Sequence, residues 1–235
     1  MIASLDLVRF PLGVAEREAL AARRAGRRGD AAFARLLLPM RLRSMPWPVP
    51  EFTIAYYFAL WRDEAALERF RAGPLRRWEN GRENLALTLR PVQSFGSWTG
   101  TDPLDGERST PHTGPTALIT HSRTRPTKLA RFLVADGPVV RALEEAPGRL
   151  WSDGFVDDLA RLDSGTLSLW RDTAAATAFA YGPGVHQSAV KSQRGGDWFS
   201  ESWFARFAIE AAAGSWGGVE AVDLVAAAAP APAAS

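Results

Sequence analysis

The chain has 235 residues, 46% hydrophobic and 23% charged, which is enough for one large domain or two small ones with a hydrophobic core. Its 28 basic and 26 acidic residues nearly cancel, so the net charge gives no support to nucleic-acid binding. Cysteine is absent, which excludes disulfides, thiolate catalysis, iron–sulfur clusters and thiolate-ligated haem. We expect a soluble, cytoplasmic protein, because no apolar run reaches the length of a membrane span and the N-terminus lacks a signal-peptide pattern.

The first hundred residues predict alternating strands and helices. Strands are indicated by alternating or aromatic residues, and helices by Ala-, Leu- and Arg-rich runs that stop at glycine or proline. In chain order the predicted elements are a strand at 4–10, one helix or two within 14–38, a loop at 41–51, a strand at 52–61, a helix at 63–71, and strands at 85–89 and 94–99.

The second half predicts the same succession: a strand at 117–122, a helix at 128–145, a strand at 165–170 and a helix at 172–181. The two halves also align directly. Leu60-Trp-Arg-Asp63 matches Leu169-Trp-Arg-Asp172, and Gly73-Pro74 matches Gly182-Pro183 at the same offset. Each half contains a closing Gly-Ser-Trp, at 96–98 and at 214–216. An internal repeat fixes the architecture before any single motif does.

Each repeat follows the ferredoxin-like pattern of strands and helices. We therefore expect an α+β fold in which tandem ferredoxin-like repeats close two sheets around a shared interior. The predicted boundaries are a first half at 1–100, a linker at 101–115, a second half at 116–225 and a disordered Ala/Pro tail at 226–235.

The repeat singles out one histidine. At the same offset, Arg77 of the first half corresponds to His186 of the second, which follows the breaker in Gly182-Pro-Gly-Val-His186. The aromatic-rich run at 198–207 predicts a second helix or a turn. An imidazole on a short helix beside aromatic side chains suits a haem ligand. On this local pattern alone, a structural histidine is the more common case.

Other chemistries have less support. The remaining histidines, His112 and His121, have no acidic residue at ligand spacing, so a metal triad is disfavoured. The paired acids Asp157-Asp158 and Glu144-Glu145 are predicted to lie on solvated helix faces, since adjacent carboxylates on a helix diverge. The motifs GxSxG, GxGxxG and the P-loop are all missing.

The final third resembles the spheroidene monooxygenases, which modify carotenoids. The resemblance rests mainly on His186, Asp197-Trp198-Phe199, Glu201 and Phe204-Ala205-Arg206-Phe207. Leu169-Trp-Arg-Asp172, Arg125-Pro126 and Gly96-Ser-Trp98 add to it. The N-terminal Arg/Ala-rich segment and residues 41–51 depart from the family, which leaves the substrate open.

This resemblance implies a haem-dependent monooxygenase that takes electrons from a partner such as ferredoxin and oxidises an apolar or secondary-metabolite substrate. It also implies the dimeric α+β barrel fold, shared with chlorite dismutases, dye-decolourising peroxidases and aldoxime dehydratases. In those relatives a histidine of the second half holds the haem, so the resemblance makes His186 the expected iron ligand of haem b.

If His186 is the axial ligand, hydrogen-bond donors are needed on the opposite face of the haem. The candidates from the strands are His121, Arg123 and Arg125, with Arg9 from the first half, and the candidates for walling the haem are Trp170, Trp198, Trp203 and Trp61. Two other functions stay open: haem-dependent dehydration or N–O bond chemistry of the aldoxime dehydratase type, and a non-catalytic barrel that binds haem or another ligand. A homo-oligomer is compatible with either.

Overall fold

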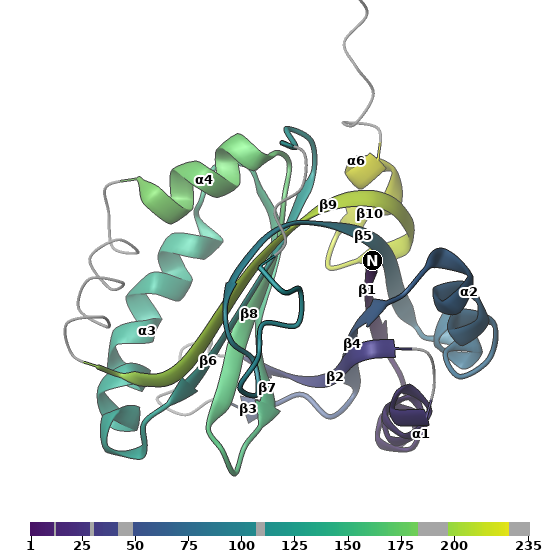
Figure 1. The fold of residues 1–235 in the computed structure, drawn as a ribbon, viewed down its shortest axis with the longest axis horizontal. Helices are drawn as coiled ribbons and strands as arrows, with labels where there is room; N and C mark the ends of the chain where they lie inside the picture. The colour runs from purple at the N-terminus through teal and green to yellow at the C-terminus, as the bar shows by residue number, and fades with distance from the viewer. Residues whose placement is uncertain (12, 29–30, 42–48, 107–110, 183–196, 226–235) are drawn as a thin grey trace, which may run out of the picture.

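The computed structural model describes residues 1–11, 13–28, 31–41, 49–106, 111–182 and 197–225. Its centre is a closed antiparallel barrel in which neighbouring strands follow the order β9-β5-β1-β4-β2-β7-β8-β6, and β6 pairs with β9 to close the ring (Figure 1). The barrel strands are β1 (Ile2–Arg9), β2 (Ala31–Arg41), β4 (Ile54–Trp61), β5 (Glu83–Gly96), β6 (Thr116–Thr124), β7 (Arg149–Asp158), β8 (Asp163–Trp170) and β9 (Phe199–Trp216). The short strands β3 (Val49–Pro50) and β10 (Val219–Glu220) extend β2 and β9.

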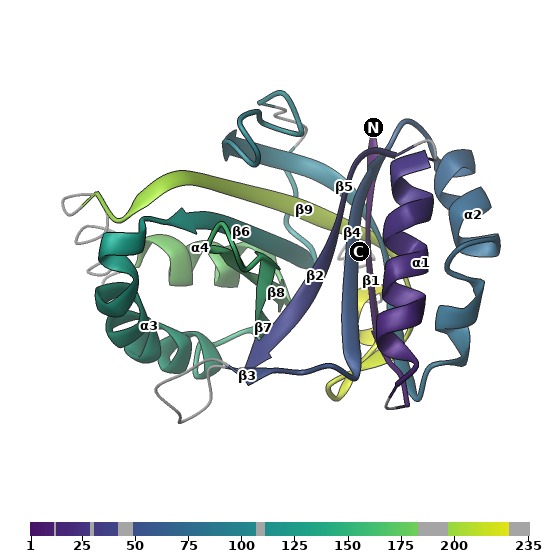
Figure 2. The ribbon, with the colours of Figure 1, turned by 90° about the horizontal axis from the view of Figure 1, so that it is seen from below.

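The helices lie outside the barrel, on two opposite sides (Figure 2). One side carries α1 (Ala15–Arg28), α2 (Glu64–Ala72) and the 3₁₀ turn η1 (Arg76–Asn80). The other side carries η2 (Pro126–Lys128), α3 (Leu129–Glu144) and α4 (Thr173–Tyr181), and the short α6 (Ala221–Val225) follows β10. Within the described residues, no helix has the length and apolar character needed to cross a membrane.

This architecture confirms the predicted fold class. The succession β1-α1-β2-β4-α2-β5 is repeated as β6-α3-β7-β8-α4-β9, and the two four-stranded sheets join along β5–β9 and β2–β7. The repeated motif also has the same local structure in both halves. Asp63 caps α2 by accepting from the Ala66 N–H at 2.8 Å, and Asp172 caps α4 by accepting from the Ala175 N–H at 2.7 Å.

Several elements differ from the sequence-based expectation. Residues 31–38, which fall in the segment predicted as helix, belong to β2, because pairing with β4 and β7 overrides the helical preference of Ala and Leu. Residues 199–216, predicted to begin as a helix or turn, form the long strand β9 between β5 and β6. Residues 149–158 form β7, and the two strands expected at 85–99 are one strand, β5.

Strand alternation separates two packing environments in each half. Inward-facing residues such as Leu5, Phe58, Ile119 and Phe207 form one core that fills the barrel. A second core lies between the first-half sheet and its helices, and a much smaller cluster around Trp170 lies between the second-half sheet and its helices. The second-half helices are therefore less tightly packed on their sheet than those of the first half.

Candidate functional site

A cluster of buried polar side chains lies inside the barrel, where β6, β7 and β8 approach the segment after β5. His121 of β6 follows Ala117 and Ile119 on the inward face. The Trp98 ring stacks on the His121 ring, with centroids 4.5 Å apart and an interplanar angle of 15°. The indole Nε1 of Trp98 donates to Asp157 of β7 at 2.9 Å.

His121 is held as a neutral imidazole. Its side chain is fully buried, and neither ring nitrogen has a hydrogen-bond partner among the described residues. Burial lowers the pKa of His121 to about 4, although the nearby carboxylates of Asp163 and Glu201 oppose the shift. At neutral pH this side chain therefore offers a nitrogen lone pair.

Two arginines bind the carboxylates of the cluster. Arg123 donates to both oxygens of Asp163, at 2.7 and 3.0 Å, and forms an ion pair with Glu201 at 2.8 Å. Arg35, which comes from β2 of the first half, pairs with Asp157 at 3.2 Å. Burial raises the pKa of Asp157, and the positive charge of Arg35 opposes that rise. The cluster thus joins the two halves through charge-assisted contacts.

Asp102 organises the neighbouring part of the barrel. Its carboxylate accepts from the Trp203 Nε1 at 2.8 Å, from the Ser94 hydroxyl at 2.8 Å and from the Leu104 N–H at 3.0 Å. Partial burial works against ionisation, but these hydrogen bonds lower the pKa of Asp102 overall. Asp102 lies in the region predicted as a linker, where it fixes the orientation of an interior tryptophan.

The outer face of the second-half sheet has a different character. Its strands present small hydroxyl side chains there, and Thr120 and Thr166 share a hydrogen bond of 2.6 Å. No residue of α3 is buried, although the helix carries apolar side chains such as Phe132 and Leu133. Arg206 of β9 lies beside Leu118 on this outer face, and its buried Nε has no hydrogen-bond partner among the described residues. This face therefore combines incompletely buried apolar surface with an arginine whose buried Nε is unpaired among the described residues.

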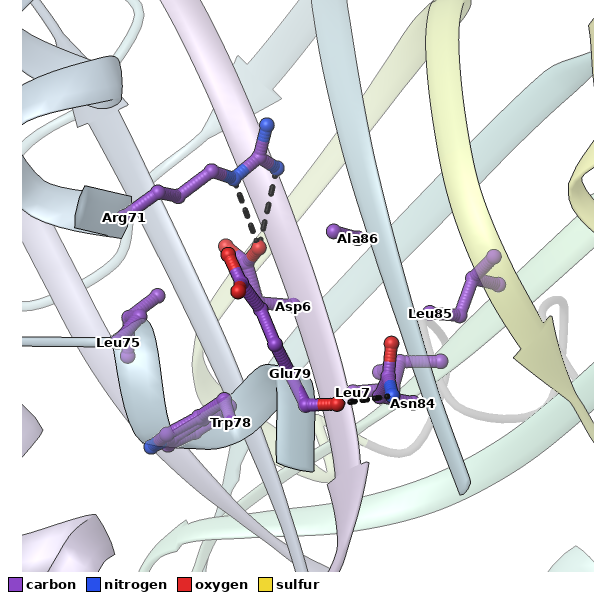
Figure 3. Close-up of a pocket in the computed structure, with 9 residues that line it drawn as sticks. All are labelled: Asp6, Leu7, Arg71, Leu75, Trp78, Glu79, Asn84, Leu85 and Ala86. Atoms are coloured by element: carbon purple, nitrogen blue, oxygen red, sulfur yellow. Dashed lines mark hydrogen bonds and ion pairs between the residues drawn. The ribbon is translucent and has the colours of Figure 1, made fainter. Parts of the chain in front are cut away.

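The corresponding face of the first half is closed more tightly. A pocket of about 50 Å³ remains between α2, η1 and strands β1 and β5, as Figure 3 shows. Trp78, Leu75 and Leu85 line it, and Arg71 crosses it to bind Asp6 at 3.0 Å. This volume suits a few water molecules and excludes a cofactor.

The comparisons with known proteins start from sequence. No protein-family model matches the chain. It is 35% identical over 172 residues to a spheroidene monooxygenase of Rubrivivax gelatinosus, covering 72% of this chain and 65% of that protein. It is 28% identical over 179 residues to the spheroidene monooxygenase of Cereibacter sphaeroides, covering 74% of this chain and 55% of that protein.

The chain is a relative of the spheroidene monooxygenases. The resemblance inferred from the sequence is thereby confirmed. The chain matches less than two thirds of the length of each of these two spheroidene monooxygenases.

Two solved structures share its fold. An aldoxime dehydratase in complex with butyraldoxime has a TM-score of 0.56 at 10% identity, covering 88% of this chain and 79% of that one. A second aldoxime dehydratase structure has a TM-score of 0.53 at 11% identity, covering 89% and 81%. At these identities the likeness concerns the barrel and its helices.

The structure of this spheroidene monooxygenase relative separates the residues expected to serve the site. His121, Arg123 and Trp203 lie together at the inner cluster. Arg125 and Trp198 lie together beyond the end of β6, where the Arg125 N–H donates to the Trp198 carbonyl at 2.9 Å. The remaining residues are elsewhere: Trp170 packs beneath α4 on the outer face, Trp61 donates to Ser4 in the first half, Arg9 pairs with Glu51 and Glu83, and His186 lies outside the described residues.

Two carboxylates were misjudged from the sequence. Asp157 and Asp158 were expected on a solvated helix, but they lie on β7, where alternation turns Asp157 inward to Trp98 and Arg35. Asp157 and Asp163 lie near His121 in space but on other strands, so the spacing of residues along the chain does not indicate that they are neighbours. The sequence signal for this strand was the run at 149–158, in which apolar residues are interspersed with acidic ones.

Proposed function

We propose that this protein is a haem-dependent monooxygenase acting on an apolar small molecule, with a spheroidene-like polyene as the leading substrate class. The observation that carries the proposal is the 35% identity, over 172 residues, to a protein named for that activity. Fold likeness alone would leave the reaction open, because one fold hosts many chemistries.

The outer face of the second-half sheet fits a haem. A porphyrin requires apolar walls on its faces and a cationic partner for its carboxylates. The partly exposed apolar side chains of α3 offer the walls, and the small Thr120 and Thr166 leave room against the sheet. Arg206 offers the cation, since its buried Nε lacks a partner in the described part of the chain. Bound haem would supply a redox-active iron that accepts electrons from a donor such as ferredoxin.

His186 is the proposed axial ligand. Arg77, with which the repeat aligns His186, lies on η1 next to Trp78. Trp78 lines the pocket between the first-half sheet and its helices (Figure 3). The repeat therefore supports a haem on the corresponding side of the second-half sheet.

The other expected site residues take different roles in this proposal. Arg125 and Trp198 lie by α3, whose Arg131 sits 5.9 Å from the Trp198 ring. We assign them to the border of the haem site, where Arg125 can orient a polar group and Trp198 can exclude water. His121 and Arg123 face the barrel interior, so their role is to hold the sheet that supports the site.

Oxygen dependence tests the reaction class. Haem-loaded protein would be incubated with reduced ferredoxin and spheroidene, under ¹⁸O₂ and under nitrogen. The proposal predicts a product that carries ¹⁸O and forms only with oxygen. A second assay offers an aldoxime to the ferrous protein under nitrogen. Dehydration of the aldoxime, together with no oxidation of spheroidene, would favour the dehydratase alternative. Failure to bind haem would leave a barrel for another ligand.

A further inference from the structure

We propose that His121, Asp157 and Asp163 form a binding site for a divalent transition-metal ion inside the barrel, separate from the proposed haem site. The three side chains come from the neighbouring strands β6, β7 and β8. One potential ligand atom from each lies within 4.8 Å of the others. Metal bonds to imidazole nitrogen and carboxylate oxygen are about 2.0–2.2 Å long, so modest side-chain rotations bring all three onto one ion.

The state of His121 is independent support. Its side chain is fully buried, and its Nε2 lies 3.8 Å from an oxygen of Asp163. Within the part of the chain that the structure describes, both of its ring nitrogens lack hydrogen-bond partners. A buried polar atom without a partner costs about 1–3 kcal/mol. By contrast, His112 has an ordinary structural contact, 2.8 Å from its Nε2 to the Pro115 carbonyl. A metal ion would supply the partner that His121 lacks.

The carboxylates are already oriented by other groups, as outer contacts orient the ligands of protein metal sites. Trp98 Nε1 and Arg35 hold Asp157, at 2.9 and 3.2 Å, while Arg123 holds Asp163. Both contacts of Asp157 fall on its Oδ2, which leaves its Oδ1 for a metal, and each oxygen of Asp163 accepts one hydrogen bond from Arg123, which leaves it a second lone pair.

The charges of the cluster permit a cation. Glu201 shares Arg123 with Asp163, so three carboxylates face two partly buried guanidiniums, Arg35 and Arg123. Arg161 also approaches Asp163, at 3.8 Å, but it is about half exposed and solvent weakens its effect.

The donor set indicates the class of ion. One imidazole nitrogen and two carboxylate oxygens suit Zn²⁺, Mn²⁺, Fe²⁺ or Co²⁺, whereas Ca²⁺ and Mg²⁺ prefer oxygen alone. Three protein ligands leave at least one coordination position for water. The competing occupant is a single water molecule that hydrogen-bonds to the same three side chains.

The test uses haem-free, chelator-treated full-length protein, titrated with Co²⁺ and followed by visible absorption, with Zn²⁺ binding measured by equilibrium dialysis. The wild type is expected to bind a single equivalent. Asp157→Asn, which preserves shape, and His121→Ala should weaken binding by more than the roughly 10–100-fold that changes outside the ligand set cause. His112→Ala and His186→Ala should bind as the wild type does, which separates this site from the haem.

Circular dichroism would establish that each variant is folded. If His121→Ala does not fold, Asp157→Asn alone still tests the proposal. Absence of a bound ion in the folded wild type would assign the site to water and overturn the proposal. Equal binding by wild type and Asp157→Asn would overturn it as well.

Discussion

Trp98 and His121 stack face to face inside the barrel, 4.5 Å apart, although they belong to different halves of the chain. Trp98 follows the last strand of the first half, and His121 lies in the first strand of the second. The indole N–H of Trp98 also donates a hydrogen bond to Asp157 of β7. A single tryptophan therefore links three parts of the barrel wall.

Replacing Trp98 by Phe should cost stability chiefly through the lost hydrogen bond. The ring remains able to stack, but Asp157 loses a buried donor, and we expect a decrease of about 1–3 kcal/mol in the free energy of unfolding. Urea denaturation measures it. Trp78→Phe is the matched control, since the buried Nε1 of Trp78 has no partner among the described residues. Equal losses in the two variants would refute a specific role for the Trp98–Asp157 bond.

The N-cap of α4 gives a second prediction. Asp172 accepts from the Ala175 N–H, so Asp172→Ala should lower the free energy of unfolding by about 1 kcal/mol, with Asp172→Asn close to the wild type. Asp63→Ala should have a similar effect on α2, because the repeat builds the same cap there. Thermal unfolding of the set provides the comparison, and an unaffected Asp172→Ala protein would contradict the capping role.

Asp136 on α3 makes stability depend on pH. Asp136 is partly buried, and the resulting desolvation raises the pKa of its carboxyl to about 6. Between pH 4 and pH 6 the folded state keeps a proton that the unfolded chain has released, so this residue's contribution to stability falls as pH rises through that window. Asp136→Asn should therefore stabilise the haem-free protein by about 1–2 kcal/mol at pH 8 and have little effect near pH 4. Urea denaturation of both proteins at pH 4 and pH 8 measures the difference. An equal gain in the free energy of unfolding at both pH values would exclude the raised pKa of Asp136 as the cause.

Arg206 should control haem affinity with little effect on the haem-free fold. A hydrogen bond to a charged group contributes about 1.5–3 kcal/mol, so Arg206→Gln should weaken haem binding by roughly 10–100-fold. Arg206→Lys, which keeps the charge, should recover part of the affinity. Titration of haem into the two variants, followed by visible absorption, tests this. Unchanged affinity in the glutamine variant would remove Arg206 from the proposed haem site.

The fold was predictable because both halves contain the same short sequence motifs at the ends of strands and the starts of helices. Asp63 and Asp172 cap equivalent helices, and the preceding Trp61 and Trp170 are both fully buried. The helix prediction was wrong for residues 31–38, because alanine and leucine favour a helix locally whereas pairing with β4 makes this segment a strand.

The site was less accessible from sequence. His121 and Arg123 were identified as polar residues on a strand, but the side of the sheet they face depends on strand register. Asp157 and Asp163 approach His121 only after three strands pair, so no spacing along the chain reveals them. His186 is proposed as the ligand because the repeat aligns it with Arg77 and because the chain resembles the spheroidene monooxygenases.

Haem ligation by His186 is tested by the absorption spectrum of haem-supplied protein, beside His186→Ala, in ferric, dithionite-reduced and carbon monoxide-bound forms. His112→Ala serves as the control histidine variant, because the His112 ring makes a structural contact with the Pro115 carbonyl, 2.8 Å from its Nε2. We expect a Soret band in the wild type and in the control, and this band should be lost or shifted in His186→Ala. A stoichiometric, unchanged band in His186→Ala would place the ligand elsewhere, and no band in any of the proteins would contradict haem dependence.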